Sequence, residues 1–325
     1  GADAMRDLIK GADVFVHNMR PEPLERLGFN YASVKPLNPS LVYCNIWGFG
    51  MKGPYAGRAA FDDIIQGVSG LVALEGFGGK EQRFVPMLIA DKATGVFAAL
   101  AMSAALYHKL ATGEGQEIEA PMFECMTSFA MIEHLAGEGF VPSIGPPGSE
   151  RHAKPMRFPV KTLDGYMCVL ATSDKHWRGL TKAGGRPELA TNERYDTRAK
   201  RLALRQEIVD LTTEMAKTRP TADWVAELAE AGVPCMQINS LDEVVTDPHL
   251  QAVGFWQEHE HDSEGTIRLM APPYSLSKTP PTIRSMPPRF GEHTGEVLAE
   301  LGYDEATVKA MLEAGAAVAE TRDDA

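Results

Sequence analysis

Apolar positions in the first third of the chain alternate between helical and strand spacing. Helical spacing covers Asp3–Lys10 and Glu22–Leu27, and a glycine follows each, as is common where a helix ends. Short apolar runs at Asp13–His17 and Leu41–Trp47 predict buried strands. Because strands and helices alternate, the pattern predicts an α/β fold with largely parallel strands.

The next segments continue this alternation. Asp91 begins a long alanine-rich segment that predicts a helix to Leu110, followed by a strand at Gln116–Ala120 and a helix at Glu124–Ala136. Glycine and proline are then dense over Gly137–Pro159. Such a change in composition indicates a domain boundary or a functional loop.

The second half of the chain predicts a smaller α+β domain and an extended tail. A strand is expected at Tyr166–Ala171, and the helices are expected at Lys175–Ala183, Arg198–Lys217 and Thr221–Ala231. A proline-rich stretch, Pro272–Pro288, precedes two last helices, Gly291–Leu301 and Asp304–Ala314.

Composition and charge narrow the class of protein. The chain has 325 residues, 44% of them hydrophobic, and a formal net charge of −12, which is typical of a soluble globular protein and excludes a disordered one. An acidic chain is a poor partner for nucleic acid or an anionic membrane. A phosphorylated ligand would therefore need a pocket built from a few arginines.

The cysteines and the apolar segments indicate a cytoplasmic protein. Cys44, Cys125, Cys168 and Cys235 are widely separated, so we interpret them as buried thiols in a reducing compartment. The most apolar segment, Val96–Leu106, is shorter than the ~20 residues that a bilayer-spanning helix needs. We therefore expect no membrane span.

Two nominal motifs carry little weight. Gly48–Gly53 matches G-x-G-x-x-G, but Pro54 follows at once and no helix is predicted to begin there, so we interpret the motif as a turn. His259, His261 and Asp262 lie in a run of charged residues that is typical of a solvated surface. We predict no metal site.

Among the acidic residues, Asp91 is the best candidate for a role in catalysis. It lies between two apolar segments, where a carboxylate is costly unless it caps a helix or takes part in a reaction. It could be the N-cap of the long helix, whose backbone N–H groups would hold it ionised. It could also be a nucleophile that attacks an acyl carbonyl, and the two interpretations are compatible.

Cationic and amide side chains follow the predicted strands. Asn18, Arg20 and Arg26 come after the first strand, and Arg58 comes after the second. Ligands of open α/β sheets bind at these strand ends, although surface arginines would give the same pattern. His152 and Lys154, in the glycine- and proline-rich loop, face either solvent or a site.

Taken together, a set of short stretches resembles the class III CoA-transferases of the CaiB/BaiF type. That family includes formyl-CoA transferase, carnitine CoA-transferase and the α-methylacyl-CoA racemases. The stretches follow the family order and are Ala12–Pro21, Leu24–Gly28, Gly53–Tyr55, Phe61–Gln66, Ala90–Gly95, Thr112–Gln116, Thr162–Tyr166, Ala231–Pro234 and Glu292–Leu298.

The resemblance implies an architecture for the whole chain. Residues 1–140 would form a Rossmann-like CoA-binding large domain and residues 141–250 a smaller α+β domain, while residues 251–325 would return to the large domain. Two chains would form an interlocked homodimer. The first βα units of the family have no counterpart before Gly1, so we expect part of the CoA pocket to be missing.

The resemblance also implies roles for individual residues. Asp91 matches the family nucleophile, which forms a mixed anhydride with the acyl group and then an aspartyl-CoA thioester. An active-site loop at residues 148–155, with Gly148, His152 and Lys154, would shield these intermediates from water. The residues that match the family's contacts with coenzyme A are Asn18, Met19, Arg20, Arg26, Arg58, Ala59, Ala60 and Phe61.

One departure from the family pattern bears on the reaction. The racemase branch has a histidine where this chain has Phe61, and a phenylalanine cannot transfer a proton. The resemblance thus favours a CoA-transferase that moves CoA from an acyl-CoA to a carboxylic acid. The alternatives are a racemase-type isomerase and an inactive CoA-binding remnant, and the sequence does not identify the two acids.

Overall fold

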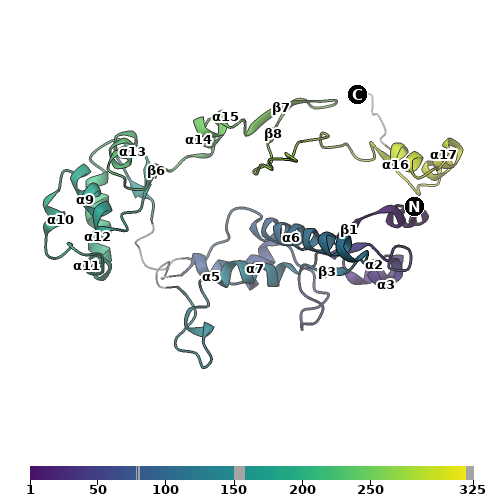
Figure 1. Ribbon diagram of the computed structural model, residues 1–325, viewed down its shortest axis with the longest axis horizontal. Coiled ribbons are helices and arrows are strands. Elements are labelled where there is room, and N and C mark those ends of the chain that lie inside the picture. Colours follow the sequence, from purple (N-terminus) through teal and green to yellow (C-terminus); the bar gives the residue numbers. More distant parts are fainter. Residues whose placement is uncertain (78, 80, 150–157, 320–325) are drawn as a thin grey trace. The chain divides into compact units, whose positions relative to one another are not determined.

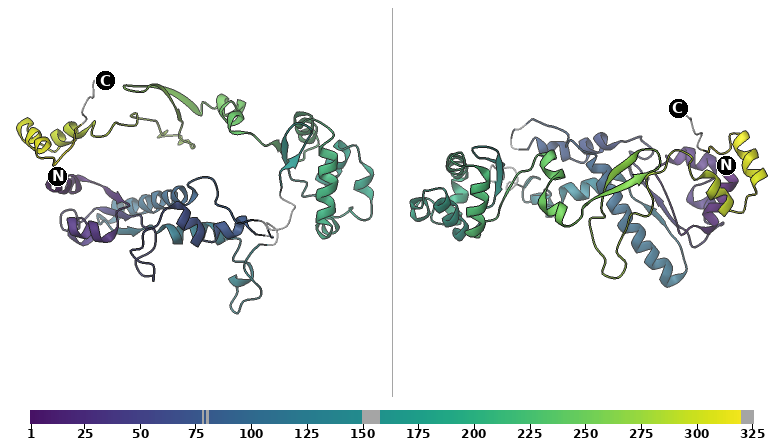
Figure 2. Two further views of the ribbon diagram at one scale, coloured as in Figure 1. Left: turned by 180° about the vertical axis from the view of Figure 1, so that it is seen from behind. Right: turned by 90° about the horizontal axis from the view of Figure 1, so that it is seen from above.

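The computed structural model describes residues 1–77, 79, 81–149 and 158–319 (Figures 1 and 2). The chain divides into two compact units. Unit 1 comprises Gly1–Ser149 and Pro287–Ala325, and unit 2 comprises Glu150–Met286. Unit 1 is therefore built from two stretches of the chain, and the domain limits expected from the sequence stay predictions.

A parallel three-stranded sheet forms the centre of unit 1. Its strands are β1 (Val14–His17), β2 (Val42–Asn45) and β3 (Glu117–Glu119). They lie in the order β1-β2-β3, and both neighbouring pairs are parallel. The middle strand β2 is buried throughout, as expected for a strand with neighbours on both sides. The parallel α/β arrangement predicted from the alternating pattern is thus confirmed in this unit.

Helices connect and flank these strands. The helical elements of unit 1 are α1 (Ala2–Gly11), α2 (Pro21–Leu27), α3 (Tyr31–Val34), α4 (Asp62–Val68), α5 (Leu71–Glu75), α6 (Ile89–Thr112), α7 (Met122–Met131), the 3₁₀ helix η1 (Ala136–Gly139), α16 (Thr294–Glu300) and α17 (Glu305–Glu313). Helix α2 ends at Gly28, whose φ of 72° is a left-handed conformation that glycine adopts without strain.

The core of unit 1 includes a cluster directly beneath the site described below. Phe49, Ile65, Ala90 and Met126 are buried together in it. These side chains join the loop after β2 to α4 and to the beginnings of α6 and α7. Burial of this apolar cluster therefore fixes the segments that carry the chemistry.

Helix α6 corrects the expectation that no segment is long enough to span a membrane. Its 24 residues are long and apolar enough to do so by length and composition, and 22% of its most apolar window is buried. The sequence estimate was too short because the helix begins before Asp91 and continues past Ser103. Core helices of soluble proteins pass the same test, and α6 packs against β2, α4 and α7.

Unit 2 has its own sheet and helices. Its strands are β4 (Val160–Lys161), β5 (Tyr166–Val169), β6 (Cys235–Gln237), β7 (Trp256–His261) and β8 (Gly265–Met270). Its helices are α9 (Asp174–Ala183), α10 (Glu188–Thr191), α11 (Arg198–Ala203), α12 (Arg205–Ala216), α13 (Thr221–Glu230), α14 (Leu241–Val245) and α15 (Pro248–Ala252). Strands β4, β5 and β6 pair antiparallel, as do β7 and β8.

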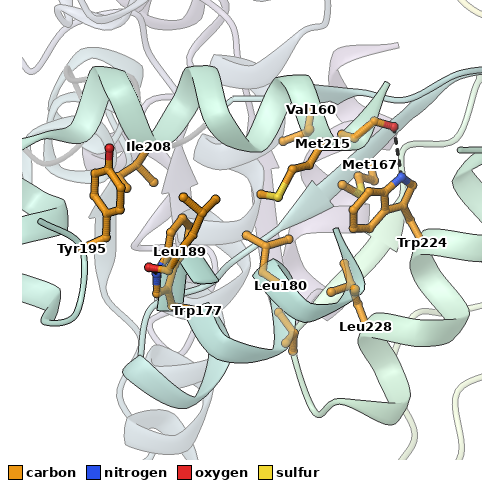
Figure 3. Packing of buried hydrophobic residues seen from close by; sticks show 13 residues of the cluster. Val160, Met167, Trp177, Leu180, Leu189, Tyr195, Ile208, Met215, Trp224 and Leu228 are labelled. Carbon is orange, nitrogen blue, oxygen red and sulfur yellow. Dashed lines mark hydrogen bonds between the residues drawn. The ribbon is translucent and has the colours of Figure 1, made fainter. Parts of the chain in front are cut away.

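Two tryptophans dominate the core of unit 2, as Figure 3 shows. Trp177 is buried against Leu189, and the Trp224 indole N–H donates to the carbonyl of Ala216. The single helix predicted over Arg198–Lys217 is wrong, because the chain leaves helical geometry at Leu204. Leu204 packs against this core, and that contact is not visible in local sequence spacing.

The charged run that includes His259 and His261 forms strand β7, which pairs with β8 in a hairpin. One expectation about unit 2 needs correction. Cys168 is exposed, whereas a buried thiol was expected. Among the described residues, no group of three or more histidine, cysteine, aspartate or glutamate side chains is placed to hold a metal ion.

Candidate active site

A pocket of about 810 Å³ lies in unit 1, at the edge of the sheet where the parallel strands end. Asn18 and Arg20 line it from the segment after β1, and Trp47 lines it from the segment after β2. Asp91 and Thr94 line it from the first turns of α6. This is the edge at which ligands of open α/β sheets bind.

The pocket brings together most of the residues singled out in the sequence. Those that line it are Asn18, Arg20, Arg58, Ala59, Ala60, Phe61 and Asp91. Met19 is outside the lining set, and its backbone N–H and carbonyl are held by His17 and Trp47. Arg26 is exposed on α2, also outside the lining set, so its contact with a ligand stays a prediction.

Asp91 lies in the first turn of α6 and is not its N-cap. The N-cap is Leu88, which offers no side-chain oxygen to the helix. The helix begins earlier than the sequence suggested because Ile89 and Ala90 already have helical geometry. The capping interpretation of Asp91 is therefore wrong, and its carboxylate is exposed at the wall of the pocket.

Asp62 takes the capping role that the sequence analysis gave to Asp91. Its carboxylate accepts the backbone N–H groups of Ala90, at 2.8 Å, and of Asp91, at 3.0 Å. Asp62 is only 3% exposed, and these contacts hold the carboxylate in place of water. Local sequence spacing gave no sign of this role, because Asp62 lies far before the helix that it caps.

Gln66 extends this support to the segment before α6. Its amide nitrogen donates to Asp62 at 2.6 Å and to the carbonyl of Met87 at 3.2 Å. Its oxygen accepts the backbone N–H of Val85 at 2.9 Å. Because Gln66 is completely buried, one turn of α4 fixes both the approach to the helix and the first turn that carries Asp91.

The surroundings of Asp91 make its carboxylate less acidic than usual. Partial burial raises the pKa of Asp91, and the nearby Asp62 carboxylate raises it further. The helix N-terminus would lower it, but Asp62 already uses two of the N–H groups there. A carboxylate whose charge is poorly stabilised is a stronger nucleophile once it is ionised.

Two arginines give the pocket a cationic wall. Arg20 and Arg58 are both exposed at it, and the Arg58 guanidinium lies 4.8 Å from the centre of the Tyr55 ring. Within the described part of the chain, no carboxylate pairs with either arginine. Arginines without a protein partner are suited to phosphate groups.

The loop after β2 is the predicted turn, and it forms part of the pocket. Gly48 and Met51 line the pocket, and no helix begins in the loop. Glu124 on α7 accepts the backbone N–H of Gly50 at 3.0 Å. A Cβ atom on Gly50 would lie 2.5 Å from that carboxylate oxygen, so the close approach requires glycine.

The predicted active-site loop is only partly described. His152 and Lys154 lie outside the described residues. Gly148 has a φ of 107°, and its N–H donates to the carbonyl of His134 at 2.7 Å. A Cβ atom there would lie 2.5 Å from the Phe77 ring, so this position needs glycine for both conformation and space.

Comparison with protein families identifies the chain. The family model described as CoA-transferase family III matches residues 1–294. The chain belongs to this family. It is therefore a class III CoA-transferase, of the CaiB/BaiF type that its motifs resemble.

Relatives with descriptive names support this membership. The chain is 32% identical, over 310 residues, to a succinate–glutarate CoA-transferase of Agrobacterium fabrum, covering 94% of this chain and 77% of that protein. It is 27% identical, over 337 residues, to a formyl-CoA:oxalate CoA-transferase of Shigella sonnei, covering 96% and 80%.

The fold is also shared with a solved structure. A CAIB/BAIF family protein from Brucella suis superposes with a TM-score of 0.79 at 32% sequence identity. The match covers 93% of this chain and 78% of that one. The mixed α/β fold of this CoA-transferase is thus the fold of its family.

Proposed function

We propose that this CoA-transferase moves CoA from an acyl-CoA thioester to a carboxylic acid through covalent intermediates on Asp91. The observation that carries the proposal is the position of Asp91 in the same pocket as Arg20 and Arg58. Asp91 offers a carboxylate nucleophile, and Arg20 and Arg58 offer guanidinium groups that no carboxylate of the described residues pairs with. Coenzyme A combines phosphates with a reactive thioester and matches both features.

Each step of the transfer is a balanced acyl exchange. The Asp91 carboxylate attacks the thioester carbonyl, forming a C–O bond while the C–S bond breaks, which gives a mixed anhydride and CoA thiolate. The thiolate attacks the Asp91 carbonyl and releases the donor acid. The acceptor carboxylate then attacks aspartyl-CoA and releases the thiolate again. The thiolate finally attacks the new anhydride, forming the product thioester and restoring Asp91.

We further propose that the acceptor is a small dicarboxylic acid. The names of the two relatives reported above refer to succinate, glutarate and oxalate, which are all dicarboxylates. The second carboxylate of such an acid needs a cation, and Arg20 and Arg58 are the exposed arginines that line the pocket.

A transfer assay tests both parts of this proposal. The purified chain is incubated with succinyl-CoA and with formyl-CoA, each with glutarate, oxalate or acetate, and chromatography follows the new thioester. We expect transfer to at least one dicarboxylate at a rate well above that to acetate. Transfer to acetate at the same rate would contradict the dicarboxylate assignment, and no transfer in any combination would contradict the activity.

Phe61 argues against an isomerase that exchanges a proton at the α-carbon. Its side chain lines the pocket, is 80% exposed and has no group that accepts a proton.

The homodimer stays part of the proposal, supported by the exposed apolar side chains of Val96, Leu100 and Leu110 along α6. The cytoplasmic location stays a prediction.

Replacing either pocket arginine with alanine should weaken binding of the acyl-CoA. We expect the KM for acyl-CoA to rise about tenfold in Arg20→Ala and in Arg58→Ala, with kcat within about threefold of wild type, because a lost charged contact affects bound substrate and transition state alike. Initial rates across acyl-CoA concentrations measure both constants.

Two other arginines serve as comparisons for this experiment. Arg178→Ala, at an exposed position on α9 in unit 2, should leave both constants unchanged. Arg26→Ala tests the sequence prediction that α2 also contacts the ligand. A fall in kcat equal to the rise in KM for Arg20 or Arg58 would contradict a purely binding role.

A further inference from the structure

His17 is a pocket residue to which the transfer steps give no role. It is the last residue of β1 and directly precedes Asn18, and both residues line the pocket. Its imidazole is half-buried and lies edge-on to the Tyr43 ring, with the ring centres 5.3 Å apart. The contacts of its two ring nitrogens can be assigned separately.

The first contact determines which nitrogen carries the proton. Nε2 of His17 lies 2.9 Å from the hydroxyl oxygen of Tyr43. That hydroxyl donates its only proton to the carbonyl of Phe29, at 2.8 Å. The Tyr43 oxygen can therefore only accept from the imidazole, so Nε2 bears the hydrogen.

The second contact requires the other nitrogen to be free of a proton. Nδ1 of His17 accepts the backbone N–H of Met19 at 3.2 Å, which needs an unprotonated nitrogen. The carbonyl of Met19 in turn accepts the indole N–H of Trp47 at 2.9 Å. Both backbone groups of Met19, in the middle of the segment Asn18–Arg20, are therefore held, one of them by a neutral imidazole.

We propose that His17 is a positioning residue, which holds the segment Asn18–Arg20 in its ligand-binding shape only while the imidazole is neutral. Protonation at Nδ1 removes the acceptor and sets two N–H groups against each other, so the segment must shift. Asn18 and Arg20 would then leave their places in the pocket wall. The assignment of coenzyme A as the ligand rests on the proposed function, whereas the His17 contacts do not.

The groups around His17 favour the neutral form near pH 7. Burial lowers the pKa of His17 below its usual value, and the neighbouring Asn45 side chain opposes this in part. Burial raises the pKa of Tyr43, so its hydroxyl stays protonated. Charged groups on the neighbouring elements include Glu117 and Glu119 on β3 and Glu22, Glu25 and Arg26 on α2. Those in the pocket wall are Arg20, Arg58 and Asp91. Acid should therefore break the Nδ1 contact, at a pH below that at which an exposed histidine titrates.

The sign of the pH effect separates this role from simple attraction. A protonated His17 would add a positive charge to a pocket for an anionic ligand, and charge alone would strengthen binding in acid. Displacement of the segment Asn18–Arg20 predicts the opposite, weaker binding in acid. The phosphate monoester of coenzyme A itself titrates at about pH 6. A variant without the imidazole therefore has to show how much of the pH dependence of binding comes from the ligand.

Two amide variants distinguish the contact made by Nδ1 from the contact made by Nε2. In His17→Asn the side-chain oxygen can occupy the place of Nδ1, so the contact with Met19 is kept but no longer titrates. In His17→Gln the amide reaches the place of Nε2, so the contact with Tyr43 is kept and that with Met19 is lost. Calorimetric titration with coenzyme A from about pH 5 to about pH 8 measures the affinity of each full-length protein.

We expect wild type to lose about three- to tenfold more affinity than His17→Asn between neutral and acid pH, the size of one lost hydrogen bond. His17→Gln should bind about three- to tenfold more weakly than His17→Asn even at neutral pH. Equal pH dependence in wild type and His17→Asn would overturn the inference and leave the proposed function standing. So would tighter binding of wild type in acid.

An imidazole spectrum provides a readout that does not depend on the ligand. Nitrogen-15 NMR of wild type at neutral pH should show the Nε2–H tautomer for His17, assigned by its absence in the variants, with a pKa below that of an exposed histidine. The Nδ1–H tautomer would overturn the inference. If neither wild type nor either variant binds coenzyme A, the proposed function fails. The spectrum then still shows which nitrogen of His17 carries the proton.

Discussion

Asp91→Asn should lower kcat by at least about a thousandfold, because the amide keeps the shape of the side chain but cannot form the anhydride. The KM for acyl-CoA should change little, since the arginines that line the pocket remain. Initial rates with the best donor and acceptor pair measure both constants. An unchanged Tm would show that the loss is chemical, as expected for an exposed side chain without a capping role.

Two further variants guard the interpretation of this result. Slow deamidation of asparagine would restore some aspartate, so Asp91→Ala should show the same loss without recovery over time. Asp63→Asn replaces an exposed acid on α4, outside the pocket lining, and should keep wild-type turnover. Turnover of Asp91→Ala near the wild-type level would contradict covalent catalysis by this residue.

Asp62→Ala should damage both stability and turnover. The N–H groups of Ala90 and Asp91 would lose their acceptor in a buried place, which costs about 1–3 kcal/mol of unfolding free energy. The first turn of α6 would loosen, and we expect kcat to fall about ten- to a hundredfold. Urea unfolding and initial rates measure the two effects, and Asp63→Ala is the matched control on the same helix.

Asp62→Asn removes the charge of this residue while its side-chain oxygen can still accept the N–H groups of Ala90 and Asp91. The hydrogen bond from Gln66 is lost, because the asparagine NH2 group is a donor. Asp91 must be ionised to attack, so kcat falls as the pH drops through its pKa. That pKa is raised in part by the Asp62 charge. Removing the charge should lower the pKa of Asp91 and move the acid limb of the kcat profile to lower pH. A limb that stays in place would show that burial alone sets the acidity of Asp91.

The sequence predicted the parts of this structure that local spacing and family motifs determine. The parallel strands β1 and β2, the helix α6 and the gathering of Asn18, Arg20, Arg58 and Asp91 all followed from such signals. The alternation of apolar segments fixes which segments become strands. Parallel strands then place the residues that follow them at one edge.

The parts that were missed depend on contacts between distant segments. Asp62 caps a helix that begins 27 positions later in the chain, and no local rule reports such a contact. In the sequence His17 is one more residue of a predicted strand, because its contacts with Tyr43 and Met19 form only in the folded chain. The break at Leu204 likewise results from packing in unit 2, against the local preference for one helix.

Trapping of the acylated carboxylate tests the central claim most directly. The protein is incubated with succinyl-CoA or formyl-CoA, treated with hydroxylamine, and digested with trypsin for mass spectrometry. Cleavage after Arg83 and Lys92 releases Phe84–Lys92, in which Asp91 is the only acidic side chain. We predict a hydroxamate on this peptide that depends on the donor and is absent from Asp91→Asn. A hydroxamate on another peptide, or none on this one while transfer proceeds, would contradict covalent catalysis by Asp91.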